Sequence, residues 1–186
     1  MTMAGGVTLR AYRGAEDVPA LVEIWNAMAE SDGMPERRDA EQMTIWFRNP
    51  TPHFDASRDV IIAEVDGLPV GWARHSWVDE GAGGRDHPVF VMLGPDHREL
   101  MPLLQDAGEA RARAAAAAQG DIGRARTLTS MAMPSQRWRS DELERRGYGV
   151  VRWFFEMLRP TLDEIAPAPL PDGLELRPVT RSRVSW

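Results

Sequence analysis

The sequence predicts an α/β (α+β) domain: a mixed, mostly antiparallel, twisted sheet of about six to seven strands flanked by helices. Three observations predict this class. Strand-like and helix-like segments alternate along residues 7–157. Asp66-Gly67 separates two β-rich segments, as in a hairpin. A continuous apolar run over 88–93 precedes a long helical stretch and is typical of a strand buried on both faces.

The first fifty residues predict one strand and two helices. Residues 7–12 alternate with the period of a strand, and a helix follows that Asp17 can cap. The apolar face of this helix is formed by Val18, Leu21, Val22, Trp25 and Ala29. A second helix from about Asp39 directs Met43, Trp46 and Phe47 inward and ends at 49–52, which contains two prolines.

The remainder of the domain predicts the sheet and two further helices. The hairpin strands are expected over 60–65 and 70–77, and the buried strand over 88–93. A long helix with an apolar stripe then runs to Gln119-Gly120. A strand over 126–131, a short helix capped by Ser135 and a last strand over 150–157 complete the order.

Composition changes after residue 160, so we expect the domain to cover 7–160. Three prolines within 161–173, together with Pro160 just before it, make this segment a semi-rigid linker. The segment 174–179 resembles 7–12, which makes 174–186 either the partial start of a second repeat or a tail.

Composition excludes several classes of protein. The net charge of −6 argues against nucleic-acid binding, and no apolar run is long enough to span a membrane. There is no cysteine and no His-x-x-x-His pair among the four histidines, so we expect no metal site. Without a secretory pattern at the start, the expected location is cytoplasmic.

The segment Leu93-Gly-Pro-Asp-His-Arg98 and the later Arg145-Arg-Gly-Tyr148 resemble motifs of the GNAT (GCN5-related) N-acetyltransferase family. The resemblance implies an acyl-CoA N-acyltransferase-like fold, acetyl-CoA as the acyl donor and a small amine-type acceptor. It leaves a homodimer open as the assembly. The linker and the repeated opening strand resemble tandem, mycothiol-synthase-like members, of which this chain would be the N-terminal half.

The resemblance also implies which residues hold acetyl-CoA. Val91, Met92 and Leu93 would pair with the pantetheine arm like an added strand. Arg98, Glu99 and Leu100 would lie at the diphosphate, where a helix N-terminus attracts anions. The chain departs from the family here, because no glycine follows Arg98 and Glu99 adds a negative charge. This departure predicts a degenerate pyrophosphate loop.

Two residues on the hairpin strands are candidate bases for acetyl transfer, Glu64 and His75. Many family members place a tyrosine acid four residues before the Gly-Phe or Gly-Tyr step, but this chain has Leu143 there. The sequence therefore supports two functions. One is an acetyl-CoA-dependent N-acetyltransferase, and the alternative is a catalytically inactive GNAT-like structural or ligand-binding domain of a truncated tandem protein.

Overall fold

The computed structural model describes residues 6–48, 53–81, 83–155, 157, 159–161, 163 and 165–178. The chain divides into two units, Met1–Gly149 and Val150–Trp186. All helices and strands found among the described residues belong to the first unit.

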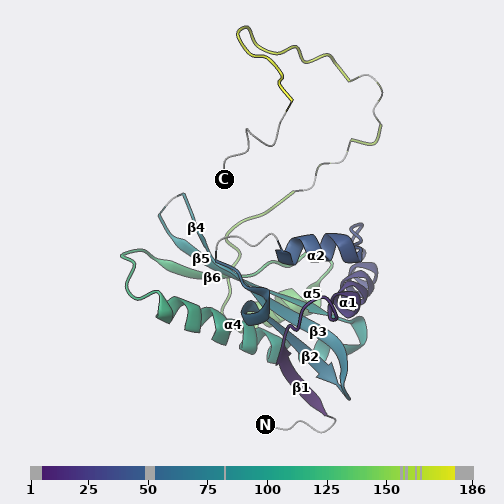
Figure 1. Ribbon diagram of the computed structural model, residues 1–186, viewed down its shortest axis with the longest axis vertical. Coiled ribbons are helices and arrows are strands. Elements are labelled where there is room, and N and C mark those ends of the chain that lie inside the picture. Colours follow the sequence, from purple (N-terminus) through teal and green to yellow (C-terminus); the bar gives the residue numbers. More distant parts are fainter. Residues whose placement is uncertain are drawn as a thin grey trace. The chain divides into compact units, whose positions relative to one another are not determined.

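Six strands of the described residues form one open sheet (Figure 1). They are β1 (Val7–Ala11), β2 (Val60–Val65), β3 (Leu68–His75), β4 (Val78–Asp79), β5 (Arg85–Leu93) and β6 (Arg126–Thr129). The order is β1-β2-β3-β5-β4, and β6 pairs with the other side of β5. Only β5 and β6 are parallel, so the predicted mixed, mostly antiparallel sheet is confirmed.

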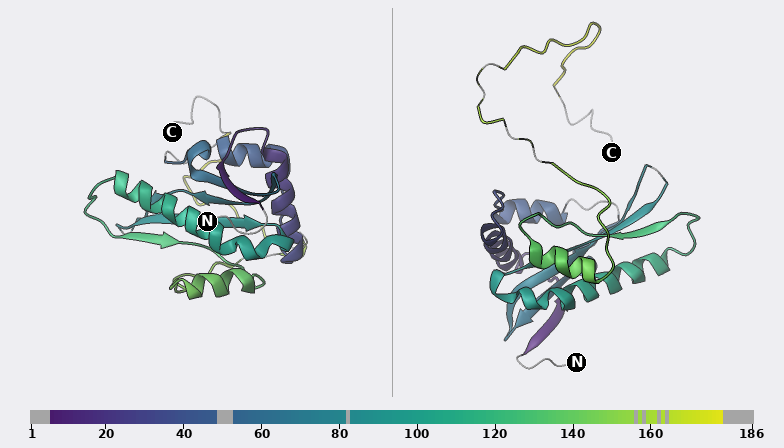
Figure 2. Two further views of the ribbon diagram at one scale, coloured as in Figure 1. Left: turned by 90° about the horizontal axis from the view of Figure 1, so that it is seen from below. Right: turned by 180° about the vertical axis from the view of Figure 1, so that it is seen from behind.

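Helices cover both faces of the sheet (Figure 2). On one face lie α1 (Val18–Ser31) and α2 (Ala40–Arg48). On the other lie α4 (Met101–Ala118) and α5 (Arg137–Arg145). Two short helices, α3 (Ala56–Asp59) and the 3₁₀ helix η1 (Pro95–Leu100), lead into β2 and α4. The sequence analysis did not anticipate α3, which is only one turn long.

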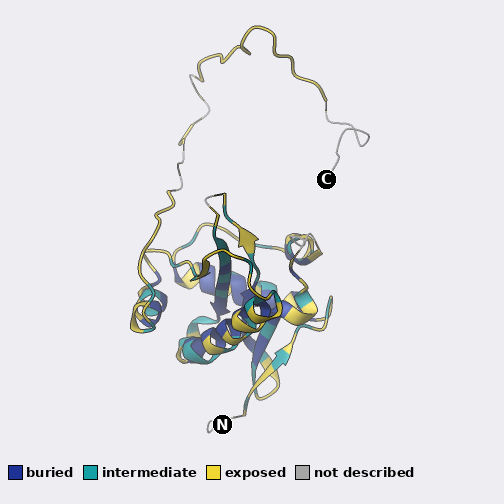
Figure 3. Cartoon of the chain, turned by 90° about the vertical axis from the view of Figure 1, so that its left-hand side faces the viewer, coloured by how far each residue is buried: buried dark blue, intermediate teal, exposed yellow. Residues whose placement is uncertain are grey.

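Alternate residues of the strands supply two separate cores. Ile62, Trp72 and Met92 pack under α1 and α2, whereas Ala73, Val91 and Leu93 pack under α4 and α5. Successive residues of β5 therefore face opposite cores, which explains the continuous apolar run. Figure 3 shows the buried stripe along α4 and the exposed residues on its outer side.

Two glycines allow α4 to lie close to the sheet. A Cβ atom at Gly71 of β3 would lie 2.4 Å from Leu93 Cδ2 and 3.0 Å from Leu104 Cδ1 of α4, and one at Gly108 of α4 would lie 2.5 Å from Val89 Cγ1. These three side chains are fully buried and have no space into which to move. The absence of side chains at the two glycines therefore sets how closely α4 lies on the sheet.

The hairpin forms as predicted. Asp66 and Gly67 both adopt positive φ, 51° and 80°, which is the backbone of a tight two-residue turn. The second strand ends at His75 rather than at residue 77, because the chain bends before β4 continues along β5. Residues 49–52, where the second helix was expected to end, lie outside the described residues.

Three expectations are corrected by the structure. Residues 150–155 and 157 form no strand, and Val150, Val151, Trp153, Phe154, Phe155 and Met157 are exposed. Strand propensity is a local property, whereas a strand also needs a neighbouring strand for its hydrogen bonds. The described residues of the unit Val150–Trp186 contain no such neighbouring strand. The short helix begins after Gln136, not after Ser135. Residues 174–178 likewise form no strand, and Val179 lies outside the described residues.

Candidate functional site

The candidate site lies where β5 and β6 part. The two parallel strands pair only from Arg85↔Arg126 to Pro88↔Thr129. Beyond Pro88, the β3 side of β5 remains paired as far as Leu93, but no strand of the described residues pairs with its β6 side. Val89 and Val91 present their carbonyl oxygens on this side, because side chains from after β6 bond to both. The strand therefore has a free edge of the kind that can pair with an extended, amide-containing ligand.

Arg139 of α5 occupies part of this free edge. Its guanidinium donates to the Val91 carbonyl oxygen at 2.5 Å and to the Met131 carbonyl oxygen at 3.3 Å. The side chain is 4% exposed, and burial lowers the pKa of Arg139 to about 10, so it stays charged at neutral pH. Arg139 was not among the site residues predicted from the sequence. Its spacing from Leu143 could have indicated it, because residues four apart lie on one face of a helix.

Asp32, at the end of α1, joins the other elements around the site. Its Oδ1 accepts from Arg98 at 2.6 Å and from the Trp138 indole at 3.2 Å, and its Oδ2 accepts from Gln136 at 2.7 Å. The carboxylate is 2% exposed. Asp32 thus connects α1, η1 and the start of α5. The predicted phosphate-binding residue, Arg98, is paired with this carboxylate and not directed into open solvent.

The turn after β5 uses several of its own N–H groups. The Gly94 N–H bonds the Val70 carbonyl, the His97 N–H bonds the Gly94 carbonyl, and the Met101 N–H bonds the Arg98 carbonyl. Pro95 and Pro102 have no N–H. These five residues therefore offer no free N–H to an anion at this helix start, in contrast to the arrangement that the resemblance implies.

The other predicted cofactor-binding residues lie around this turn. Val91, Met92, Leu93 and Leu100 are buried, and all but Met92 face the core under α4. Glu99 is 65% exposed, and its carboxylate lies 3.7 Å from the His97 ring. The structure thus brings the six predicted residues to one end of β5, with backbone groups and not side chains available to a ligand along the strand.

Glu64 lies away from this cleft. Its carboxylate accepts from Arg10 Nε at 2.6 Å, and Arg10 also binds Asp17 with its two other nitrogens. Glu64 pairs with Pro69 near the start of β3, whereas His75 ends that strand. At about 3.3 Å per residue the two predicted bases are roughly 20 Å apart. The structure does not bring them together.

His75 belongs to a buried polar cluster under α4. Its Nε2 lies 3.2 Å from Nδ1 of His87, and its Nδ1 lies 4.0 Å from Asp59 Oδ1. Asp59 also accepts from Arg58 at 2.7 Å and from Arg111 at 2.7 Å. Burial acts to raise the pKa of Asp59, but the contacts with His75, Arg58 and Arg111 outweigh it and hold that pKa well below the usual range.

From the environment of the His87 ring we predict that the folded protein loses stability in mild acid. Burial, together with the field of His75, lowers the pKa of His87 from 6.5 to about 4. Between these values the unfolded chain binds a proton that the folded protein does not, so the free energy of unfolding falls as pH falls from about 6.5 to 4. Urea titrations at several pH values should show this slope, amounting to up to about 3 kcal/mol.

The control for this slope is His87→Leu, which removes the titrating group. A variant that keeps the full wild-type slope between pH 6.5 and 4 would contradict the assignment.

Tyr148, at the predicted Gly-Tyr step, is held in the packing of α4. Its hydroxyl lies 3.1 Å from Glu109 Oε1 and 3.1 Å from Gln105 Nε2. Burial and the Glu109 charge raise the pKa of Tyr148 well above its usual value. Leu143, the residue at the expected acid position, is buried in the same core. Neither side chain is placed to protonate a thiolate at the free edge of β5.

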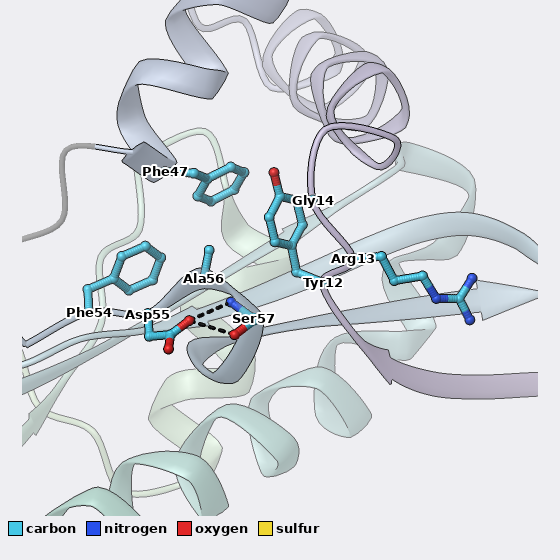
Figure 4. Close-up of a pocket in the computed structure, with 8 residues that line it drawn as sticks. All are labelled: Tyr12, Arg13, Gly14, Phe47, Phe54, Asp55, Ala56 and Ser57. Atoms are coloured by element: carbon cyan, nitrogen blue, oxygen red, sulfur yellow. Dashed lines mark hydrogen bonds between the residues drawn. The ribbon is translucent and has the colours of Figure 1, made fainter.

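An open hollow of about 490 Å³ lies elsewhere, where β1 ends and α3 begins (Figure 4). Tyr12, Phe47 and Phe54 form its aromatic wall. Asp55 lines it as well, but this carboxylate caps α3 by accepting from the Ser57 N–H at 3.0 Å and the Ser57 hydroxyl at 2.6 Å. Figure 4 shows Arg13 extending away from the aromatic rings. None of the residues predicted for catalysis or cofactor binding lines this hollow.

Two further searches of the described residues gave negative results. No helix in that part of the chain is both long enough and apolar enough to cross a membrane. No group of three or more histidine, aspartate or glutamate side chains there is arranged to hold a metal ion.

Sheet order, the parallel β5–β6 pair that opens beyond Pro88, and helices on both faces define the fold class. The chain has the fold of the GNAT N-acetyltransferases. One similar structure is the GCN5-related N-acetyltransferase of Sphaerobacter thermophilus, with a TM-score of 0.62 and 18% identity. The match covers 77% of this chain and 43% of that protein, so this chain spans less than half of its length.

Two similar structures contain acetyl-CoA. One is yncA of Salmonella typhimurium, described as an acetyltransferase and solved with its cofactor acetyl-CoA. The match has a TM-score of 0.55 and 18% sequence identity, and it covers 78% of this chain and 81% of that one. The other is a predicted acetyltransferase of Clostridium acetobutylicum, solved with acetyl-CoA. This match has a TM-score of 0.57 and 16% sequence identity, and it covers 82% of this chain and 96% of that one. No protein-family model and no curated protein matches the sequence.

Proposed function

We propose that this chain binds acetyl-CoA along the free edge of β5 and transfers the acetyl group to a small amine-type acceptor. The observation that carries the proposal is the opening between β5 and β6 beyond Pro88, which leaves one side of a buried strand without a strand partner. Backbone groups of Val91 and Leu93 would hold the pantetheine arm in the manner of an added strand. The two similar structures solved with acetyl-CoA support the choice of donor.

The reaction needs little from the protein beyond positioning. The amine nitrogen attacks the thioester carbonyl, an N–C bond forms and the C–S bond breaks, the nitrogen gives up a proton, and the CoA thiolate takes up a proton. The candidate bases Glu64 and His75 stay predictions. His75 pairs with Val89 from the β3 side of β5 and is 2% exposed, whereas the cleft lies on the β6 side, and Glu64 is engaged by Arg10. The geometry therefore gives no preference for His75 over Glu64.

A non-catalytic role is the second candidate, and Arg139 is the observation that favours it. A donor bound along β5 has to displace the guanidinium from the Val91 carbonyl. The Arg98–Asp32 pair, the acidic Glu99 and the N–H-poor turn also weaken an anion site. These features support the degenerate pyrophosphate loop expected from the sequence. In this role the domain would hold a ligand or a partner without turnover.

Titration calorimetry with acetyl-CoA, followed by mass spectrometry of free CoA with a panel of small amines, separates the two functions. Binding with amine-dependent release of CoA supports acetyl transfer. Binding without release supports the ligand-holding role. No heat at about 0.1 mM protein contradicts donor binding by the wild-type chain.

Three finer features belong to the same proposal. A tandem arrangement is supported by the partial coverage of the Sphaerobacter thermophilus protein and by the resemblance of 174–179 to 7–12.

Association with a second copy is supported by the exposed apolar side chains of Val151, Trp153 and Phe155, because such patches usually bind other protein surfaces. Sedimentation equilibrium tests the homodimer. We also propose a cytoplasmic location, with which the lack of cysteine is compatible.

A further inference from the structure

Arg74 is a buried cation that the proposed reaction does not use. It lies in β3 opposite Phe90 of β5, on the face that α1 and α2 cover. The residue is 8% exposed. Its guanidinium carbon lies 4.4 Å from the centre of the Trp46 ring and 4.2 Å from that of Phe54. The charge is therefore held between two aromatic rings in a site largely removed from water.

No carboxylate among the described residues forms an ion pair with Arg74. Its Nε is buried and has no hydrogen-bond partner. Burial, with the repulsion of Arg38, lowers the pKa of Arg74 to about 10, so the group remains charged at neutral pH. The one carboxylate that acts on it electrostatically, Asp59, is already bonded by Arg58 and Arg111. A buried, unpaired charge costs several kcal/mol, so proteins rarely keep one without a partner.

A second guanidinium lies beside the same ring. The Arg38 guanidinium carbon is 4.6 Å from the centre of the Trp46 ring and 4.3 Å from that of Trp25. Its carboxylate partner, Glu36, is 54% exposed, and its own Nε is buried without a hydrogen bond. Two arginines therefore flank Trp46 with only one, mostly exposed, acidic partner.

We propose that Arg74, with Arg38 and the rings of Trp46 and Phe54, binds the carboxylate of a small ligand. Arginine presents its N–H donors in a planar fork that matches a carboxylate, and aromatic walls accept the flat body of the ligand. Phe54 contacts both the guanidinium and the open hollow of Figure 4, which places the site beside a surface that a small molecule can reach.

This site also indicates which class of acceptor the protein would acetylate, an inference that rests on the proposed function. Phe90, opposite Arg74, directly precedes Val91, whose carbonyl faces the cleft. Two strand spacings put a ligand paired along the free edge of β5 roughly 10 Å from the middle of β3. An amine that carries a carboxylate at the far end of its body could be held by Arg74 while its nitrogen reaches the cleft.

The test uses the full chain without acetyl-CoA, so its outcome is independent of whether the protein transfers acetyl groups. Benzoate is the probe, and benzamide is its neutral counterpart of the same shape. In calorimetry and thermal unfolding, benzoate should bind and raise the Tm, and benzamide should do neither. Arg74→Met should weaken benzoate by about tenfold or more. Arg113→Met, which removes an exposed arginine on α4, should leave the affinity unchanged.

The stability of the variant gives a second readout. Because methionine replaces an unpaired buried charge with an apolar side chain, Arg74→Met alone should not lower the Tm. Equal effects of benzoate and benzamide would overturn the inference, and this comparison needs no variant. Unchanged benzoate binding by Arg74→Met would overturn it too, and binding of inorganic phosphate in place of benzoate would reject the carboxylate assignment.

Discussion

The Arg139→Ala substitution is expected to increase the affinity for acetyl-CoA by about 10- to 150-fold. In the wild-type chain the guanidinium donates to the Val91 carbonyl on the free edge of β5. A hydrogen bond from a charged group contributes about 1.5–3 kcal/mol, and a donor that pairs with this edge has to break it. Alanine removes both the bond and the bulk, so the corresponding free energy becomes available to binding. Calorimetry on both proteins measures the change.

The matched control is Arg137→Ala in the first turn of the same helix. Arg137 is exposed, so its removal changes the net charge equally without opening the cleft. Its affinity for acetyl-CoA should equal that of the wild type. An Arg139→Ala variant that stays folded by circular dichroism and binds acetyl-CoA more weakly would contradict the prediction, because Arg139 would then contact the donor and not exclude it.

The second large effect concerns stability. Asp59→Asn is expected to lower the free energy of unfolding by about 3–5 kcal/mol, since it breaks a buried ion pair from one side. Asp59 is 1% exposed and accepts from Arg58, from Arg111 and from the Asp55 N–H. Asparagine keeps the shape but leaves Arg111, whose side chain is 20% exposed, without its counter-charge. Urea unfolding at pH 7 measures the loss.

Asp79→Asn provides the comparison on the surface. Asp79 also pairs with two arginines, Arg85 and Arg124, but it is 43% exposed. Exposed ion pairs contribute about 0–1 kcal/mol, so this variant should change little. Similar losses for the two variants would show that burial is not what gives the Asp59 cluster its strength.

Much of the fold could be predicted from local sequence. The β-branched residues within 60–65, the Asp66-Gly67 turn and the apolar run ending at Leu93 each carry a backbone preference that neighbouring residues determine. These patterns were enough to predict the class of sheet and the order of its elements along the chain. Residues 150–157 show the limit of the same reasoning, because high strand propensity cannot supply a partner strand.

The sequence by itself thus determined the order of the main helices and strands between residues 7 and 145 and which of their faces are apolar. The tertiary structure alone decided how the candidate site is filled. Arg139 reaches Val91, 48 residues away, and Arg98 reaches Asp32, 66 residues away. Such contacts depend on how α1, α5 and β5 pack against one another, and no period or spacing within a segment encodes that geometry. The physical reason is that backbone preference acts between neighbours, whereas a buried charge takes whichever partner the packing brings to it.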